Sequence, residues 1–239
     1  MNIAGRLPKY WWAALIVALA VSIVVAGCRK PKSAEPNAPP STQLSTGNEP
    51  NGAAATVPDQ ISLFDGTTLG QWKIADFENQ GKIYVKDSAI HLEKGNYMTG
   101  ITWTGPLMRM NYEITLEAMR AAGGDFFCGL TFPVGENPCS LILGGWGGQV
   151  CGLSNLDHYD AANNETTRVL DFKNGTWYRV RLHVKPDRIQ AWLDDDELVN
   201  IETTGRRIGI RIEVEPCKPL GISTWDTHGA VRNIQMKEL

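Results

Sequence analysis

The chain has 239 residues, with 23 Lys and Arg against 26 Asp and Glu, and its formal net charge is −3. Hydrophobic residues make up 43% of the chain and charged residues 21%, which is the balance of a globular protein rather than of a disordered one. The negative net charge and the absence of basic clusters exclude a typical nucleic-acid-binding protein.

The N-terminus has the three zones of a secretory signal. Arg6 and Lys9 give a positive start, residues 11–26 are uncharged and almost wholly apolar, and small residues precede Cys28. Val25-Ala-Gly-Cys28 resembles the lipobox of bacterial lipoproteins, which implies a signal peptide over 1–27 and lipid attachment at Cys28. An uncleaved membrane anchor is the alternative. In both cases we expect the remaining chain outside the cytoplasm, attached to the cell envelope on its periplasmic or outer surface.

Two further regions follow the signal. Residues 28–60 are rich in Pro, Ser, Asn, Ala and Thr and contain no aromatic residue. Such a composition cannot bury enough apolar surface to offset the entropy of ordering, so it predicts a disordered tether. Residues 61–239 are the folded candidate and are long enough for one hydrophobic core.

Alternation of apolar and polar residues predicts antiparallel strands in this domain. It is clearest over 111–118, 177–184 and 207–215, and Gly, Pro, Asn and Asp interrupt the chain at short intervals. No long segment has a helical period, so the prediction is an all-β, two-sheet antiparallel sandwich. The acidic run 194–197 lies between two strand-like segments and is interpreted as a hairpin turn rather than a metal site.

Several motifs resemble the 3-keto-disaccharide hydrolase domain family, also called DUF1080. Leu63-Phe-Asp-Gly-Thr-Thr-Leu69 with Trp72 is similar to its start, the segments 177–181 and 188–193 to its hairpin, and 232–234 to its last strand. The resemblance covers the whole domain and implies a concanavalin A-like jelly-roll sandwich acting on 3-keto-glycosides. Residues 123–167 further resemble a branch of planctomycete lipoproteins.

Two motifs depart from the family pattern. Pro133 stands where many members have an Arg, and Ser223 and Trp225 stand at or near the Gln and His of the family's "GLQ.HG" ending. The commonest polar constellation of the family is therefore incomplete, and its catalytic roles are not carried over to this chain.

The chemistry of a 3-keto-glycoside directs the choice of site residues. Removing the acidified C2 proton requires a base, and the resulting enolate requires a cationic or metallic partner. Arg211 and Glu213 share a face of a predicted strand, and with Asp157 they are the catalytic candidates. A solvent-exposed ion pair without function is the alternative for the first two.

The substrate-binding candidates combine aromatic rings that can stack on a sugar with nearby polar groups: Trp146, Trp225, Asp226 and His158. His158 has no second histidine at metal-ligand spacing, so an ordinary loop residue is its alternative. The loop around it has the oxygen-rich composition of a calcium site without EF-hand spacing, in Asp157, Asp160, Asn163, Asn164 and Glu165. No cofactor is established by this pattern, and calcium or another divalent metal stays open.

Four cysteines follow Cys28. If the glycine-rich segment 144–148 closes a hairpin centred at Gly145, Cys139 and Cys151 face each other with Cα atoms about 4.5–5.5 Å apart, within reach of a disulfide. Cys128 alternates with apolar residues and is expected to be a buried thiol.

Three functions fit these observations. The first is a hydrolase or lyase acting on 3-keto-glycosides, favoured because the resemblance covers the full domain. The second is a non-catalytic carbohydrate-binding module on the same sandwich, and the third is a structural or interaction domain of the envelope. The expected partners are a carbohydrate and, through the lipid anchor, a membrane.

Overall fold

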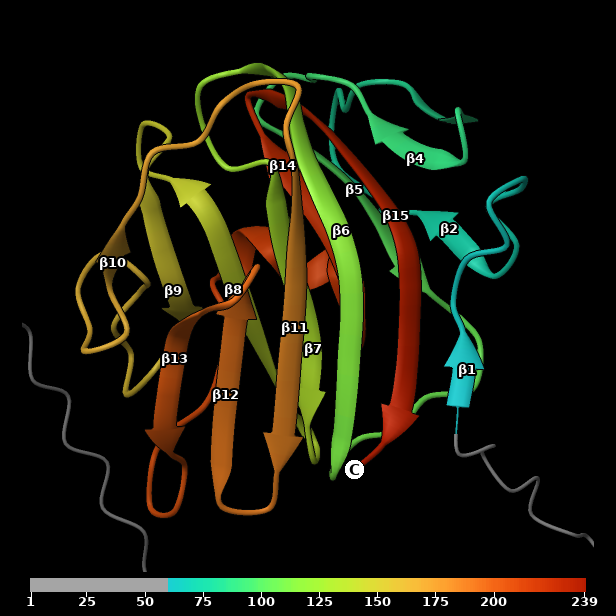
Figure 1. The fold of residues 1–239 in the computed structure, drawn as a ribbon. Coiled ribbons are helices and arrows are strands. Elements are labelled where there is room, and N and C mark those ends of the chain that lie inside the picture. Colours follow the sequence, from blue (N-terminus) through green and yellow to red (C-terminus); the bar gives the residue numbers. More distant parts are fainter. Residues whose placement is uncertain (1–59) are drawn as a thin grey trace, which may run out of the picture. The chain divides into compact units, whose positions relative to one another are not determined.

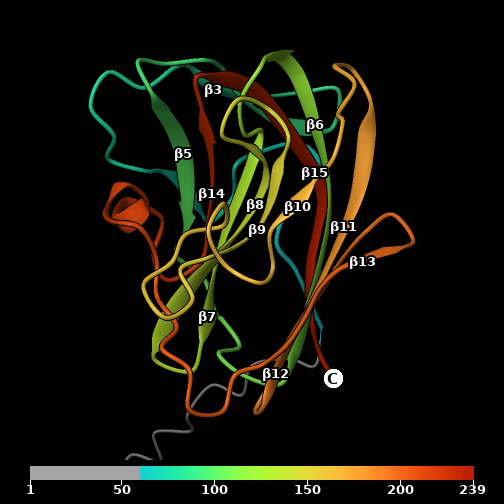
Figure 2. The same ribbon diagram turned by 90° about the vertical axis from the view of Figure 1, so that its left-hand side faces the viewer.

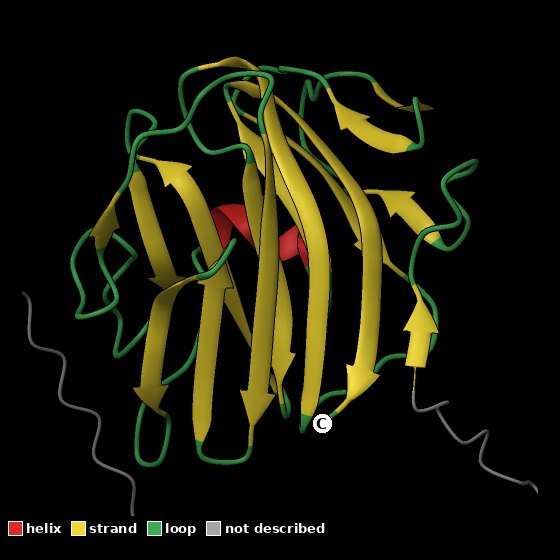
Figure 3. Ribbon diagram, in the orientation of Figure 1, coloured by secondary structure: helices red, strands yellow, loops and turns green. Residues whose placement is uncertain are grey.

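Two antiparallel sheets account for most of residues 60–239, the part of the chain that the computed structural model describes (Figure 1 and Figure 3). The signal peptide, the lipid-attachment residue Cys28 and nearly all of the tether lie outside the described residues, so these hypotheses stay predictions. Within 60–239, no helix has the length and apolar character needed to cross a membrane.

The first sheet is built from β1 (Gln60–Ser62), β3 (Ile83–Lys86), β4 (Ala89–Leu92), β6 (Tyr112–Gly123), β11 (Trp177–Lys185), β12 (Arg188–Leu193), β13 (Asp196–Glu202) and β15 (Thr227–Glu238). Their spatial order is β13-β12-β11-β6-β15-β4-β3, and β1 also pairs with β15. The second sheet is built from β2 (Trp72–Ile74), β5 (Met98–Trp103), β7 (Cys128–Val134), β8 (Asn137–Gly145), β9 (Val150–Ser154), β10 (Arg168–Val169) and β14 (Gly221–Trp225). Their order is β10-β9-β8-β7-β14-β5-β2.

The core lies between the two sheets. In β6, Tyr112, Ile114 and Leu116 are buried and alternate with half-buried polar residues, as the pattern over 111–118 predicts. The same alternation in β11 buries Val180 and Leu182. From the other sheet, β7 and β8 add large buried side chains to the same core. The predicted all-β two-sheet antiparallel sandwich is confirmed.

The acidic run forms a hairpin turn, as predicted. Asp194 and Asp195 connect β12 to β13, and Asp194 has a φ of +51°, a left-handed conformation that Asp tolerates better than most residues. The Asp194 carboxylate accepts a hydrogen bond from the Arg179 backbone N–H at 2.9 Å. The carboxylate therefore stabilises the turn.

The predicted strand over 207–215 is wrong. Only its first residues pair, where the backbone of Gly209 exchanges hydrogen bonds with Asn155 at 2.6 and 3.1 Å. The chain then forms the short 3-10 helix η1 (Ile212–Cys217). Pro216 has no N–H and cannot continue a ladder of hydrogen bonds. Figure 2 shows η1 outside the second sheet, beside β5 and β14.

The predicted disulfide between Cys139 and Cys151 is also wrong. Ser140 pairs with Ser154, so the hairpin is centred near Gly147 rather than Gly145, and the two cysteines are not opposite each other. A bulge between Ile142 and Gly145 accompanies this shift. Both thiols are free and buried, and burial raises their pKa values to about 12 and about 11. Cys128 is a buried free thiol, as predicted.

Candidate functional site

The outer face of the second sheet is lined by short side chains. Ser140 and Ser154 alternate with core residues along β8 and β9, and Ser223 does so along β14. The Ser140 hydroxyl lies 2.9 Å from that of Thr131, and the Ser223 hydroxyl donates to the Gly129 carbonyl at 3.4 Å. Because none of these side chains reaches far from the sheet, the face leaves room above it.

A pocket of about 260 Å³ occupies this room. Its walls come from four strands, η1 and two loops, through Met98, Asp125, Phe126, Ser140, Ile142, Trp146, Ser154, Arg211, Glu213, Val214 and Trp225. Four residues selected from the sequence, Trp146, Trp225, Arg211 and Glu213, therefore line one pocket.

A glycine-rich turn presents Trp146 to the pocket. Trp146 has a φ of +50° and is 44% exposed, and the next residues, Gly147 and Gly148, also have positive φ. A Cβ atom on Gly148 would lie 2.7 Å from the Gly124 carbonyl oxygen, so the turn requires glycine there. The Asp125 carboxylate accepts a hydrogen bond from the Gly147 N–H at 3.0 Å and ties the turn to the neighbouring loop.

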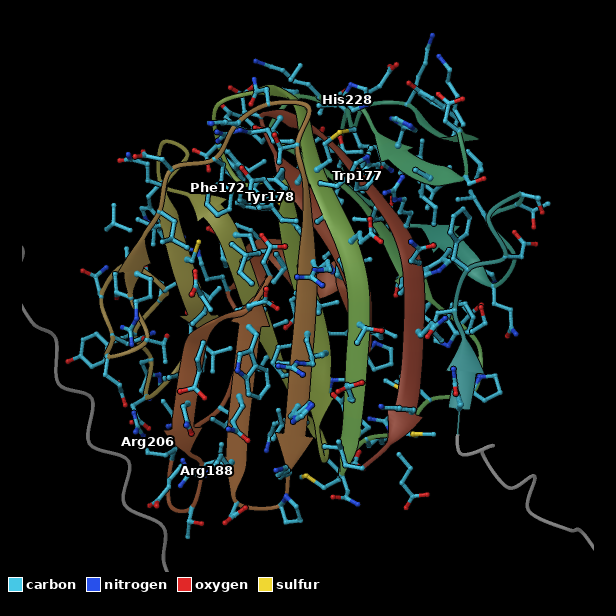
Figure 4. All side chains as sticks on the ribbon, in the orientation of Figure 1. Phe172, Trp177, Tyr178, Arg188, Arg206 and His228 are labelled. Carbon is cyan, nitrogen blue, oxygen red and sulfur yellow. The ribbon has the colours of Figure 1, made fainter. Side chains whose placement is uncertain are left out.

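A buried arginine supports the base of this turn. Arg120 is 7% exposed and donates hydrogen bonds to the Gly148 carbonyl at 3.2 Å, the Phe172 carbonyl at 2.6 Å and the Asn174 side chain at 2.7 Å. Phe172 in turn packs edge-on against Tyr178, with ring centroids 5.1 Å apart (Figure 4). Hydrogen bonds from Arg120 therefore anchor the Trp146 turn to the Phe172 and Asn174 segment.

The other aromatic wall is formed by Trp225 at the end of β14. Its backbone N–H donates to the Phe126 carbonyl at 3.0 Å, and its ring lies 6.5 Å from that of Phe126. The pocket thus has aromatic surface from three separate segments of the chain, a composition suited to the C–H faces of a sugar ring.

The polar wall is an ion pair. The Arg211 guanidinium donates to the two Glu213 carboxylate oxygens at 2.5 and 3.3 Å, and to Asp160 at 3.1 Å. The hydrogen bonds from Arg211 lower the pKa of Glu213, and those to Glu213 raise the pKa of Arg211, in both cases against the effect of burial. Both groups are charged at neutral pH, so the pocket holds a carboxylate base and a fixed cation side by side.

The catalytic candidate Asp157 and the binding candidate His158 are not among the residues that line this pocket. The Asp157 carboxylate accepts hydrogen bonds from Arg206 at 2.6 Å and from the Arg207 N–H at 2.7 Å, and these bonds lower its pKa. His158 lies 3.1 Å from the Arg207 guanidinium. Asp157 lines a second pocket of about 510 Å³, which Arg206 also lines.

The residues of the suspected calcium loop do not fit a calcium ion. Arg206 bonds to both Asp157 and Glu165, and Asp160 accepts from Arg211 and from the Ala162 N–H. Within 60–239, no group of three or more His, Cys, Asp or Glu side chains is arranged to hold a metal. The carboxylates of this loop are neutralised by arginines.

Asp226 is next in sequence to the pocket residue Trp225. It has a φ of +45°, and its carboxylate pairs with the Lys94 ammonium at 2.6 Å. It is not among the residues that line the pocket.

Sequence reasoning missed part of the site. Asp125, Phe126, Ser140 and Ser154 line the pocket, but no motif in the sequence selects them. A weak signal was present, because Gly152 and Ser154 alternate with Cys151 and Leu153, and Ser140 interrupts an apolar run. Such a pattern marks a sheet face with empty space above it.

The chain is similar in sequence to one protein family and in fold to several solved structures. The model of the 3-keto-alpha-glucoside-1,2-lyase-like domain family matches residues 59–237. No curated protein matches the chain. Among solved structures, a candidate glycosyl hydrolase from Parabacteroides distasonis is similar at 13% identity, with a TM-score of 0.50 over 76% of this chain and 94% of that one. The Crh5 transglycosylase in complex with NAG is similar at 9% identity, with a TM-score of 0.51 over 76% and 84% of the two chains. At these identities the structures support the fold alone.

Proposed function

The chain belongs to the 3-keto-alpha-glucoside-1,2-lyase-like domain family, and from this premise we propose that its pocket binds a 3-keto-glycoside and cleaves the bond between C1 and the glycosidic oxygen. The observation that carries the proposal is the shared pocket of the Arg211–Glu213 pair and the two rings of Trp146 and Trp225. A base, a cation and stacking surfaces therefore surround a space on the scale of a single sugar ring.

Binding uses the aromatic walls and the serine floor. The rings of Trp146 and Trp225 offer flat apolar surfaces to the C–H faces of the sugar. The hydroxyls of Ser140 and Ser154 line the same pocket and can exchange hydrogen bonds with sugar hydroxyls. Together they position C2 of the sugar toward the ion pair.

The reaction begins at C2. The Glu213 carboxylate removes the proton made acidic by the C3 ketone, and the C2–H electrons form an enolate whose charge gathers on the ketone oxygen. The Arg211 guanidinium stabilises that charge. The enolate then collapses into a C1–C2 double bond, the C1–O bond breaks, and the departing oxygen takes the proton from Glu213. Addition of water across the double bond completes hydrolysis.

A carbohydrate-binding module without catalysis is the second candidate, and one observation favours it. Glu213 is already bonded to Arg211, and these bonds lower its pKa and so its strength as a base. On this view the pair donates and accepts hydrogen bonds with sugar hydroxyls and removes no proton.

Incubation with oxidised and unoxidised sugars separates the two functions. The protein is mixed with 3-keto-sucrose, 3-keto-trehalose and the parent disaccharides, and release of the free sugars is followed by chromatography. Release from the keto-sugars alone supports the lyase or hydrolase. Binding without release, measured by calorimetry, supports the binding module. If neither occurs, the proposed function is wrong.

We also propose that the protein is a lipoprotein held on the extracytoplasmic side of a membrane. The support is the signal-like segment 1–27 and the lipobox-like sequence that ends at Cys28. Cys28→Ser is expected to abolish acylation and to leave an unprocessed precursor. A Cys28→Ser protein that is still processed and lipidated would contradict the proposal.

A further inference from the structure

A tyrosine continues the aromatic wall beyond the pocket. Tyr97 precedes β5, and its ring centroid lies 5.3 Å from that of Trp225 at an interplanar angle of 42°. Trp225 is in turn 6.5 Å from Phe126 inside the pocket. Phe126, Trp225 and Tyr97 therefore form one aromatic strip that runs from the pocket to its rim.

Tyr97 is exposed and yet held in place. Its side chain is 60% exposed, so the ring is available to a ligand. Its backbone has a φ of +75°, and its carbonyl accepts a hydrogen bond from the Asp226 N–H at 2.7 Å. The next residue, Met98, pairs with Trp225 in the sheet. An exposed aromatic ring on a fixed backbone loses little freedom when it binds a ligand.

Polar groups stand at the same end of the strip. Lys94 and Asp226 form an ion pair at 2.6 Å, and their side chains are 57% and 53% exposed. An ammonium donor beside a carboxylate acceptor fits hydroxyl groups, which both donate and accept. Because the two charges balance, the position favours an uncharged ligand.

We propose that Tyr97, with Lys94 and Asp226, forms a second sugar subsite, which holds the ring attached to C1 of the 3-keto sugar in the pocket. This inference rests on the proposed function and assigns the residues that would contact the leaving-group sugar. A leaving group without a ring, such as methanol, makes no contact with the subsite.

The test compares a one-ring and a two-ring ligand. Binding of methyl 3-keto-α-glucoside and of 3-keto-trehalose is measured by calorimetry in a Glu213→Gln background, which prevents cleavage. Tyr97→Ala is expected to weaken binding of 3-keto-trehalose about tenfold through loss of the stacked ring, and to leave the methyl glycoside unchanged. Tyr97→Phe, which keeps the ring, is expected to bind both ligands as its parent does.

Tyr159→Ala is the matched control, because Tyr159 is also 60% exposed but lines the second pocket. This substitution is expected to leave the affinities for the methyl glycoside and for 3-keto-trehalose unchanged. Equal weakening of both ligands by Tyr97→Ala, or no weakening of either, overturns the subsite while the proposed function stands. If the parent binds neither ligand, the proposed function fails first and the subsite with it.

Discussion

The outer faces of the two sheets have opposite character. On the first sheet, long side chains pair with one another: Glu113 bonds to His183 at 2.6 Å, and Glu117 bonds to Arg232 at 2.7 Å. The Arg232 guanidinium also lies 4.1 Å from the ring centre of Trp177, which Figure 4 labels. On the second sheet, serines and glycines face outward, and the charged and aromatic groups stand around a pocket rather than over the strands.

The difference lies in what covers the aromatic rings and charged groups of each face. Both faces carry an Arg–Glu pair and tryptophans, so residue type alone does not distinguish them. On the first sheet each tryptophan is covered by a guanidinium, with Arg181 lying 4.3 Å from the ring centre of Trp192. On the second sheet Trp146 remains 44% exposed beside an open pocket. The space left by short side chains is where the proposed sugar site lies.

The largest expected effect concerns the two glutamates. Glu213→Gln removes the proposed base and should lower turnover of a 3-keto-glycoside by about 10²–10⁴-fold. Glu117→Gln, which alters an Arg–Glu pair on the opposite face, should leave turnover unchanged. Steady-state kinetics on both variants make the comparison, and equal losses would contradict the assignment of function to the second sheet.

The tryptophans offer a second comparison. Trp146→Ala should weaken sugar binding by about tenfold, because a stacking surface is lost. Trp192→Ala should not affect binding, since its ring lies against Arg181 on the other sheet. Calorimetric titration with methyl 3-keto-α-glucoside measures both, in a Glu213→Gln background that prevents cleavage. If only the Trp192 variant lost affinity, the sugar site would lie on the first sheet, which would contradict the account.

The pH dependence of turnover sharpens the role of the ion pair. A base must be deprotonated, so kcat/KM should fall only as the pH drops through the pKa of Glu213, which the hydrogen bonds from Arg211 hold below its ordinary value of 4.5. Arg211→Gln should lower turnover and move this acid limb to higher pH. If the acid limb of the pH profile of the residual activity stayed at the same pH, Arg211 would not control the pKa of Glu213.

The smallest expected effect is on stability. Hydrogen bonds from Arg232 and Asn233 lower the pKa of Glu117, although burial acts in the opposite direction. A carboxylate whose pKa is lower in the folded state stabilises the fold at pH values above its pKa in the unfolded state. This stabilisation is lost as the pH falls through its pKa in the folded state. Glu117→Gln should therefore cost about 1 kcal/mol of unfolding free energy at pH 7. When unfolding by urea is measured at acid pH, the difference in unfolding free energy between the parent and Glu117→Gln should become smaller. A difference that did not change with pH would show that the substitution acts through packing rather than through charge.

Much of the fold could be predicted from local patterns, whereas the site could be predicted only in part. The alternation in 111–118 and 177–184 predicts β6 and β11 because each strand has one buried face. The predicted strand over 207–215 fails because only its first residues find a backbone partner, at 155–157, and the chain enters η1 at Ile212. The disulfide fails because Gly145 still belongs to β8 and the turn lies at 146–149, so Cys151 is not opposite Cys139. Although Arg211 and Glu213 do not lie on a strand, their side chains are hydrogen-bonded at the start of η1.

The most direct test of the carbohydrate site on the second sheet follows the tryptophan indole N–H signals by NMR. The Glu213→Gln protein, in which cleavage is prevented, is labelled with ¹⁵N, each signal is assigned by a Trp→Phe substitution, and methyl 3-keto-α-glucoside is added stepwise. The signals of Trp146 and Trp225, which line the pocket, should shift with a common saturation curve, whereas those of Trp177 and Trp192 should not move. Shifts confined to Trp177 and Trp192, or no saturable shift at Trp146 and Trp225, would contradict the account.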